Sequence, residues 1–306
     1  MDVESRKVIV IAGGTGGIGR HIVDGIVAAK KYTVKVFSRQ DPSSLVDMTV
    51  KGVIVVKVDY SDRDLLVKEL QGVHTVIVTL ISLDDSCVQA QINLLNAALK
   101  AKVKRIAPSE WTGQHDENTV IELYRRLKVP VREKIKAAGI EYTVFMIGLL
   151  MDYFASPQTA SKSIGSLVIG VDFSKCVASI TGSGDEPFCL TRADDVGKFV
   201  AAALELDKWN ENSGIVGSRT TWNEIIKLGE KIRGTKFHVQ YTCADEAARL
   251  IDTMTDNVLE KLIQQVYLGI VRGEFDFEAT LNNICPEIKP TTIEQFLMES
   301  WADYKG

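Results

Sequence analysis

A glycine-rich segment near the N-terminus constrains the fold of this chain more than any other feature. Residues 7–12 form an apolar, β-branched run, and Gly13-Gly14-Thr15-Gly16-Gly17-Ile18-Gly19 follows it directly. Beyond the glycines, Ile22 and Ile26 continue an apolar face at helical spacing. This order of strand, loop and helix is typical of a dinucleotide-binding unit, because the helix N-terminus offers N–H groups to phosphates.

The glycines of this loop have separate expected roles. Gly13 permits the tight turn, Gly16 lets the backbone approach a pyrophosphate, and Gly19 lets the helix pack closely on the strand. The G-x-x-G-x-x-G spacing resembles that of extended and atypical short-chain dehydrogenases/reductases. We therefore expect cofactor contacts from the loop residues Gly13, Thr15, Gly16, Gly17, Ile18 and Gly19.

The end of the second predicted strand, residues 32–38, indicates which dinucleotide is bound. NAD-binding enzymes usually place an acidic residue there to accept hydrogen bonds from the ribose hydroxyls. This chain has Arg39, whose guanidinium pairs with a 2′-phosphate instead, and Ser38 adds a hydroxyl. The sequence favours NADP(H), with Asp41 keeping NAD as the alternative.

Composition excludes several classes of protein. The 306 residues carry a formal net charge of −4 and no basic tract, so we expect no nucleic-acid partner. We expect no membrane span, and the N-terminus runs into the first strand without room for a signal peptide. Five cysteines without a C-x-x-C and four histidines predict reduced thiols and no metal site. We expect a cytoplasmic monomer or homodimer that acts on a small molecule.

Strand and helix patterns alternate through the first half of the chain and predict an α/β fold. Continuous apolar strands separated by amphipathic helices indicate a Rossmann-type doubly wound parallel sheet. Further strands are expected at 53–58, 75–80, 105–107 and 142–147, and helices at 63–70, 86–101 and 123–138. The prediction is a Rossmann domain over residues 1–150 and a smaller, interleaved substrate lobe over 151–306. The last sheet strand is expected from about 190–220, at 214–217.

Ligands of such sheets bind beyond the carboxyl ends of the strands, which selects further candidates. Asp59 and Tyr60 end the third strand and could meet the adenine, although Asp59 is equally suited to cap the next helix. Thr79 and Leu80 follow the fourth strand, and Gly148 follows the sixth. We expect these five residues to contact the cofactor.

The chemical residues are expected on the helix after the fifth strand. Tyr124 and Lys128 are four residues apart, so they share one face of a continuous helix. Hydride transfer to a substrate leaves negative charge that needs a proton, and an ammonium group makes a nearby phenol a better acid. Lys128 is also placed to hold the ribose hydroxyls, and Ser109, just past the fifth strand, is a third candidate donor.

These residues resemble those of the NmrA-like and isoflavone-reductase-like atypical short-chain dehydrogenases. The family includes phenylcoumaran benzylic ether and pinoresinol–lariciresinol reductases. The similarity covers most of the first two thirds of the chain and fades after about residue 235. It is carried by the glycine loop, Arg39 and the segments 105–111, 128–132, 138–143, 152–154 and 191–197. The resemblance places the family's catalytic lysine at Lys128, whereas family members usually have an apolar residue where this chain has Tyr124.

The resemblance implies an NADPH-dependent reductase of a small aromatic molecule or other secondary metabolite, acting on a C=C, C=O or C=N bond or a benzylic ether. The main alternative is an NmrA-like regulatory protein that binds NADP and senses redox state without turnover. A third is an epimerase-like or isomerising enzyme that keeps its cofactor bound. We expect substrate contacts from Trp111, Met151, Tyr153 and Phe154, with core packing as the alternative for the last three.

Overall fold

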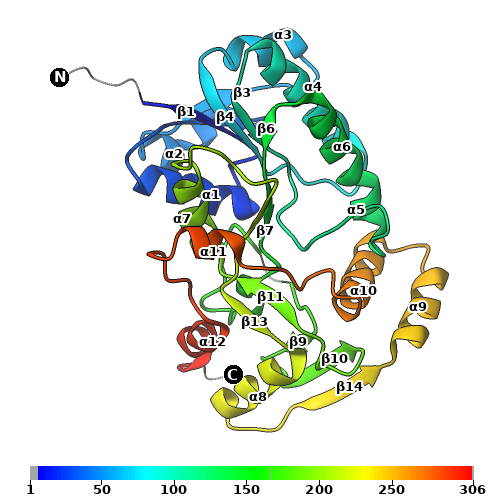
Figure 1. Cartoon of the computed structure of the whole chain (residues 1–306). Helices are drawn as coiled ribbons and strands as arrows, with labels where there is room; N and C mark the ends of the chain where they lie inside the picture. The colour runs from blue at the N-terminus through cyan, green and yellow to red at the C-terminus, as the bar shows by residue number, and fades with distance from the viewer. Residues whose placement is uncertain (1–5, 166, 305–306) are drawn as a thin grey trace. The chain divides into compact units, whose positions relative to one another are not determined.

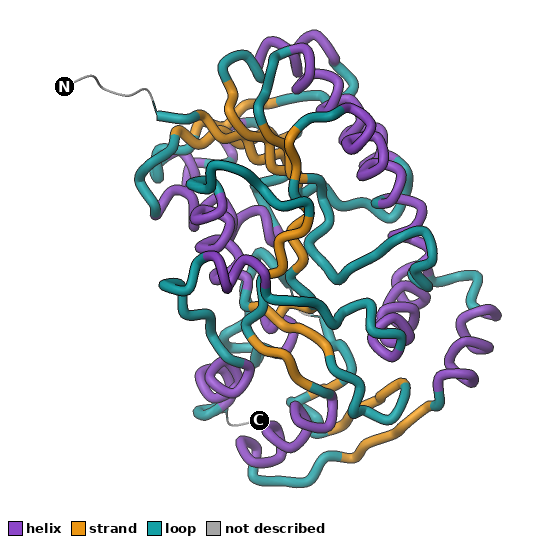
Figure 2. Tube along the Cα trace, viewed as in Figure 1, coloured by secondary structure: helices purple, strands orange, loops and turns teal. Residues whose placement is uncertain are grey.

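The computed structural model describes residues 6–165 and 167–304, which fold into two compact units (Figures 1 and 2). The first unit comprises Met1–Trp111, Arg126–Phe145 and Val196–Ser213. The second comprises Thr112–Arg125, Met146–Asp195 and Gly214–Gly306. The chain therefore passes between the units several times.

The first unit is built on a six-stranded parallel sheet. Its strands lie in the order β3-β2-β1-β4-β5-β6, and each neighbouring pair is parallel. Their bounds are β1 Val8–Ala12, β2 Thr33–Ser38, β3 Ile54–Lys57, β4 Val73–Val78, β5 Arg105–Ala107 and β6 Glu141–Tyr142. This order confirms the predicted doubly wound sheet. Strands β1 to β3 are added toward one edge and strands β4 to β6 toward the other, so the order of connection reverses between β1 and β4. Sheets of this kind bind ligands at that reversal, beyond the carboxyl ends of the strands.

Helices cover both faces of this sheet. Figure 1 shows α1 and α7 on one face and α3, α4 and α6 on the other. The bounds are α1 Gly17–Ala28, α2 Val46–Thr49, α3 Arg63–Glu69, α4 Ser86–Lys100, α6 Val129–Ala138 and α7 Ala193–Ala203, with a 3₁₀ turn at Pro42–Ser44. The central strands are apolar because both faces are covered, and Ile9, Val10 and Ile11 are fully buried. Where α1 meets α7, a Cβ on Gly25 would overlap the backbone of Gly197.

The second unit has two small sheets and its own aromatic core. One sheet has the order β14-β10-β9 and the other β13-β11-β8. Phe154, Phe173 and Trp222 pack with edge-on rings in the core. The strands are β8 Leu149–Leu150, β9 Val171–Asp172, β10 Val177–Thr181, β11 Phe188–Thr191, β13 Ser218–Thr220 and β14 His238–Thr242. The helices are the 3₁₀ turn Met151–Phe154, α8 Trp222–Arg233, α9 Ala244–Thr253, α10 Val258–Val271, α11 Thr280–Ile284 and α12 Ile293–Trp301.

Three predicted elements differ in the structure. The strand expected at 142–147 is two short strands, β6 in the large sheet and β7 Val144–Met146 in a separate ladder. The helix expected over 123–138 is two helices, α5 Glu122–Leu127 and α6 Val129–Ala138, with Lys128 as the N-cap residue of α6. Pro130 explains the break, because proline has no N–H to continue a helical ladder and belongs in a first turn. The prediction that residues 214–217 form the last strand of the large sheet is wrong. The observed strand is β12 Asn212–Gly214, which pairs with β7 Val144–Met146 in a separate ladder.

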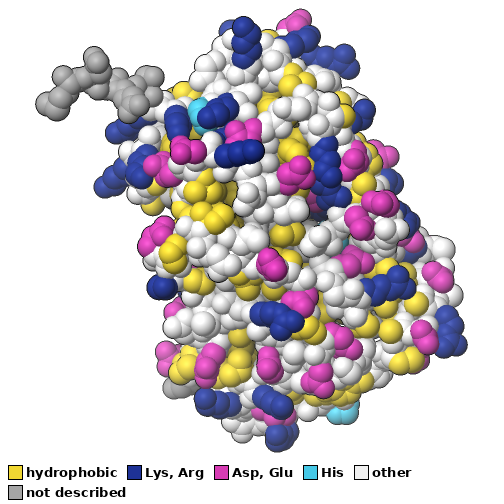
Figure 3. Space-filling model, in the orientation of Figure 1, with side chains coloured by type: hydrophobic (Ala, Val, Ile, Leu, Met, Phe, Trp, Pro, Cys, Tyr) yellow, Lys and Arg dark blue, Asp and Glu magenta, His cyan; other side chains and the backbone are white. Residues whose placement is uncertain are grey.

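Surface and helix properties add two observations. On the face shown in Figure 3, basic and acidic side chains are interspersed. Across residues 6–165 and 167–304, no helix combines the length and the apolar character needed to cross a membrane.

Candidate active site

The glycine loop between β1 and α1 is shaped by close backbone packing. Gly13 has a φ of +89°, a conformation that side chains disfavour. A Cβ on Gly19 would lie 2.5 Å from Thr79 Oγ1 and 2.6 Å from the carbonyl oxygen of Gly13. Thr79 is itself fixed, because its hydroxyl donates to the carbonyl of Ala12, 3.1 Å away. Gly19 therefore allows α1 to begin directly against the ends of β1 and β4.

The opposite side of the same loop leaves room beside the backbone. A Cβ built on Gly16 or Gly17 would meet no described atom within 4 Å. Gly16 is the N-cap residue of α1, and no side chain of the described residues caps this helix. The first N–H groups of a helix need acceptors, and a phosphate supplies them at the positive end of the dipole. The residues present therefore fit the diphosphate of a dinucleotide, with Thr15 and Ile18 half-buried in the same loop.

Arg39 follows β2 directly and is exposed. Within the described part of the chain, no ion pair or hydrogen bond is recorded for its guanidinium, whereas Arg20 pairs with Asp24 and Asp47. Asp41, the residue that kept NAD as an alternative, is used locally. It accepts hydrogen bonds from Ser43 N at 3.0 Å and Ser43 Oγ at 2.7 Å, and these bonds lower its pKa. Ser38 is buried, and its hydroxyl accepts a hydrogen bond from Gln40 N at 3.0 Å.

Asp59 and Tyr60, expected near the adenine, are engaged in local structure. The Tyr60 ring is buried, and its hydroxyl donates to the carbonyl of Phe37 at 3.1 Å. Asp59 accepts hydrogen bonds from Ser61, whereas Asp62 caps α3. The capping role considered for Asp59 thus belongs to Asp62, and the adenine contacts stay a prediction.

The ends of β4 and β5 are tied together by Ser109. Its hydroxyl donates to the carbonyl of Leu80 at 2.8 Å, and its backbone N–H donates to Gln91 Oε1 at 2.9 Å. Trp111 makes a similar link, because its indole N–H donates to the carbonyl of Val78 at 2.7 Å. Ser109 and Trp111 therefore hold the carboxyl ends of β4 and β5 together. The proposed proton-donor role of Ser109 stays a prediction.

Lys128 reaches this same segment. Its Nζ donates to the carbonyl oxygen of Ser109 at 2.9 Å and to that of Glu110. Removal from water lowers the pKa of Lys128, and the Glu110 carboxylate opposes this shift without cancelling it. A lysine with a lowered pKa, fixed at the carboxyl end of β5, is a stronger acid than an exposed lysine and is suited to donate a proton.

Tyr124 lies in the second unit, on α5. Its ring packs on the His115 ring with centroids 4.8 Å apart. The expectation that Tyr124 and Lys128 share one face of a continuous helix is wrong, because the helix ends at Leu127 and a new one begins after Lys128. The roles of both residues in catalysis stay predictions.

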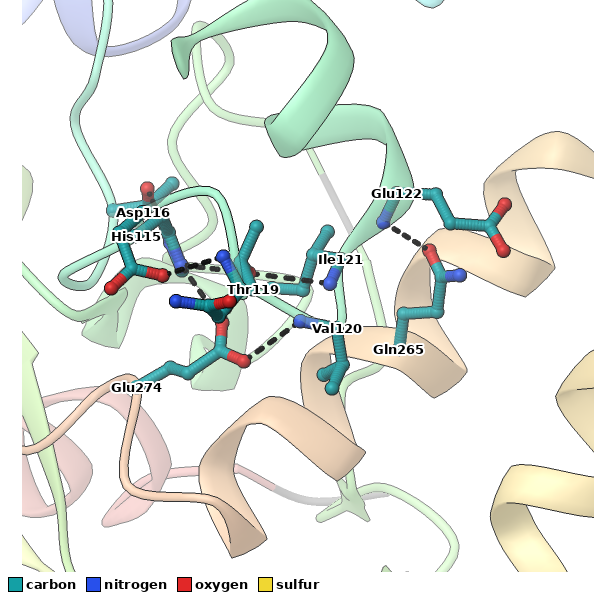
Figure 4. A network of polar contacts seen from close by, with 10 residues as sticks. His115, Asp116, Thr119, Val120, Ile121, Glu122, Gln265 and Glu274 are labelled. Atoms are coloured by element: carbon teal, nitrogen blue, oxygen red, sulfur yellow. Dashed lines mark hydrogen bonds and ion pairs between the residues drawn. The ribbon is translucent and has the colours of Figure 1, made fainter.

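The environment of His115 was missed by sequence reasoning (Figure 4). His115 Nδ1 lies 3.0 Å from Glu274 Oε2, and Nε2 lies 3.1 Å from Thr112 Oγ1. The Glu274 carboxylate also accepts hydrogen bonds from Val120 N and the Thr119 hydroxyl. A polar pocket of about 330 Å³ lies here, lined by Gln114, Asp116, Asn118, Thr119, Arg272, Gly273 and Glu274. His115 and Glu274 are 159 residues apart, so no short motif could have joined them.

The four residues expected to contact the substrate lie in different environments. Met151 and Phe154 are buried in the core of the second unit, which favours the alternative of core packing. Tyr153 packs against that core and is partly buried. The Trp111 ring stacks on Phe145 with centroids 5.2 Å apart. Substrate contacts of Tyr153 and Trp111 stay predictions.

Gly148, expected at the cofactor, has a packing role. It has a φ of +68°, and a Cβ there would overlap the carbonyl of Cys189 in β11. The glycine is therefore required because the backbone just before β8 passes close to β11 in the second unit. No group of three or more His, Cys, Asp or Glu side chains suited to a metal ion occurs among residues 6–165 and 167–304.

The sheet order and the glycine loop define a Rossmann-type dinucleotide-binding protein. The NmrA-like family model matches residues 5–297, and the chain belongs to this family. It is 35% identical over 238 residues to the oxidoreductase BOA1 of Botryotinia fuckeliana, covering 75% of this chain and 77% of the relative. It is 27% identical to the isoflavone reductase homolog IRL of Zea mays, covering 97% and 99%.

The fold is shared with solved reductases. The complex of leucoanthocyanidin reductase with NADPH from Vitis vinifera superposes with a TM-score of 0.76 at 19% identity, covering 95% of this chain and 98% of that one. The predicted family and the assignment as an oxidoreductase are confirmed by these comparisons.

Proposed function

We propose that this protein is an NADPH-dependent reductase of a small aromatic or related organic molecule, and that Lys128 supplies the proton. The observation that carries the proposal is the anchoring of Lys128 at the end of β5, in the same unit as the glycine loop. The named reductase relatives support it. Bound NADPH supplies a hydride; the residues of the chain bind the nucleotide and provide the proton.

Two features support NADP(H) over NAD(H). Arg39 presents an exposed guanidinium beyond β2, where a 2′-phosphate lies in enzymes of this fold. Asp41 is the nearby carboxylate that could accept from ribose hydroxyls, and its Oδ1 already accepts two hydrogen bonds from Ser43. The NADPH complex of the grapevine relative agrees with this preference.

The anchoring of Lys128 suits a proton donor. An ammonium group has three N–H donors and a neutral amine has two. The carbonyls of Ser109 and Glu110 accept two hydrogen bonds, so Lys128 can lose one proton and keep both. Both anchoring hydrogen bonds are therefore compatible with either protonation state of Lys128.

The test is NADPH oxidation with a panel of conjugated aromatic ketones, enones and benzylic ethers. For the best compound, we expect Lys128→Ala to lower kcat by about 10²–10⁴-fold while NADPH affinity changes far less. Lys134→Ala, on the same helix, is the matched control. If Tyr124→Phe instead causes the large loss, the tyrosine is the acid. Unchanged kcat in Lys128→Ala would refute the proposed role, and NADPH binding without turnover of any compound would favour the regulatory alternative.

A further inference from the structure

Glu110 is a buried carboxylate whose charge is not explained by hydrogen bonding. Its side chain is 2% exposed, and no donor within the described residues hydrogen-bonds its Oε1. Burial of an ionised group costs several kcal/mol unless nearby charges compensate. A glutamine would have nearly the same shape and no charge to bury. The carboxylate at this position therefore calls for a role that depends on its charge.

Two cations of the first unit lie close to Glu110. Arg132 Nη1 lies 3.6 Å from Glu110 Oε1, and the Arg132 side chain is only 12% exposed. Lys128 Nζ donates to the backbone carbonyl of Glu110 itself, so the ammonium is fixed at the residue that carries the carboxylate. Arg132 lies one helical turn after Lys128, since its N–H donates to the Lys128 carbonyl at 3.1 Å. Arg132 therefore pairs with the Glu110 carboxylate, and Lys128 is held at the backbone carbonyl of the same residue.

We propose that Glu110 is a positioning residue whose carboxylate keeps Lys128 protonated until the proton is transferred to the substrate. This inference rests on the proposed function, in which Lys128 gives up one proton and becomes a neutral amine that water reprotonates. The proton passes from Lys128 to the substrate and is replaced from water, without passing through Glu110. Without it, the buried lysine would lose its proton to solvent at a lower pH.

The charges that face Lys128 act in opposite directions. Removal from water lowers the pKa of Lys128, Glu110 and Cys87 raise it, and Arg132 lowers it. Cys87 lies on α4, and burial raises the pKa of its thiol, so it stays neutral at neutral pH. Among the described residues, Glu110 and Arg132 are therefore the charged side chains whose opposite effects on Lys128 substitutions can test.

The experiment measures the pKa of Lys128 directly, by NMR of protein labelled with ¹³C at lysine Cε and assigned with Lys128→Arg. Glu110→Gln should lower this pKa by about one unit or more. Arg132→Met should raise it, and Glu110→Asp, which keeps the charge, should stay close to wild type. Glu133→Gln is the matched control, because Glu133 is an exposed carboxylate on the same helix. The basic limb of the pH profile of kcat/KM should move in the same direction as each pKa.

Each result separates this inference from the proposed function. An unchanged Lys128 pKa in Glu110→Gln, or a shift of equal size in Glu133→Gln, would overturn the inference. If Glu110→Gln does not fold, an unchanged pKa in Arg132→Met overturns it. If the pKa moves as expected but the kinetic limb does not, Glu110 controls the lysine and the role of Lys128 in the proposed function fails.

Discussion

Gly16 and Gly19 are three residues apart in the same loop, and alanine substitution should separate binding from stability. At Gly19 the new Cβ would lie 2.5 Å from Thr79 Oγ1, about 0.9 Å short of the 3.4 Å at which ordinary contact begins. The second obstacle is the backbone carbonyl of Gly13 at 2.6 Å, which no side-chain rotation relieves. At Gly16 the Cβ would meet no described atom within 4 Å. Its φ of −155° is ordinary extended backbone.

These distances set the expected magnitudes. Overpacking at Gly19 costs about 1–3 kcal/mol, and the gain in helix propensity returns about 0.5–1 kcal/mol. The middles of these two ranges, about 2 and about 0.75 kcal/mol, lead us to expect that Gly19→Ala lowers the free energy of unfolding by about 1.25 kcal/mol. Gly16→Ala should change it by about 0.5 kcal/mol or less, the difference between glycine and alanine as N-cap residues.

For NADPH affinity we expect the opposite: Gly16→Ala, which barely changes stability, should weaken NADPH binding. A methyl group at Gly16 would displace a phosphate from the backbone, and losing one charge-assisted hydrogen bond costs about 1.5–3 kcal/mol, or roughly 10–100-fold in Kd. Urea denaturation followed by circular dichroism measures the first effect, and calorimetric titration with NADPH measures the second. A Gly16→Ala protein that binds NADPH as tightly as wild type would refute the assignment of this loop to the diphosphate. A Gly19→Ala protein as stable as wild type would refute the packing argument.

Other predictions concern the nucleotide, the core and pH. Arg39→Ala should weaken NADPH binding by about 1.5–3 kcal/mol and leave NADH unchanged in calorimetry; equal losses for both would exclude a 2′-phosphate contact. Phe154→Ala should lower the free energy of unfolding by about 3–5 kcal/mol and leave KM unchanged, because the ring packs in the hydrophobic core. A higher KM would show that Phe154 contacts the substrate. Burial raises the pKa of Glu274, but hydrogen bonds led by that from His115 outweigh it, so the folded pKa lies below the ordinary 4.5. The stability from Glu274 is therefore present above pH 4.5 and lost as pH falls through the folded pKa. The difference in unfolding free energy between wild type and Glu274→Gln should shrink on acidification, and a constant difference would contradict this.

Local pattern was enough to place most elements of the first unit. The strand at Arg105–Ala107 begins and ends where the sequence predicted, since it depends on local hydrophobic spacing. The break before α6 also had a local signal, Pro130, which outweighs helical spacing. The strand at 214–217 failed because which strands pair is decided by long-range contacts. An apolar run identifies a strand but does not name its partner.

The burial of particular side chains was the second feature that the sequence could not predict. Met151 and Phe154 follow a strand end, where sequence reasoning expects ligand contacts, yet both are enclosed by residues from distant parts of the second unit. The His115–Glu274 pair has the same origin, because its members meet only when α10 brings Glu274 beside the loop after β5. Sequence spacing carries no information on such contacts.

The segment after β5 shows why a predicted site can be correct in place and different in detail. Sequence reasoning selected Ser109 for its hydroxyl, because side chains are what a sequence displays. In the structure that hydroxyl holds Leu80, and the contact to Lys128 is made by the backbone carbonyls of Ser109 and Glu110. Every residue has a carbonyl, so side-chain identity could not reveal this contact. Side-chain identity at these two positions matters in other ways. The Ser109 hydroxyl holds its segment against Leu80. The buried Glu110 carboxylate is the side chain whose charge should change the pKa of Lys128.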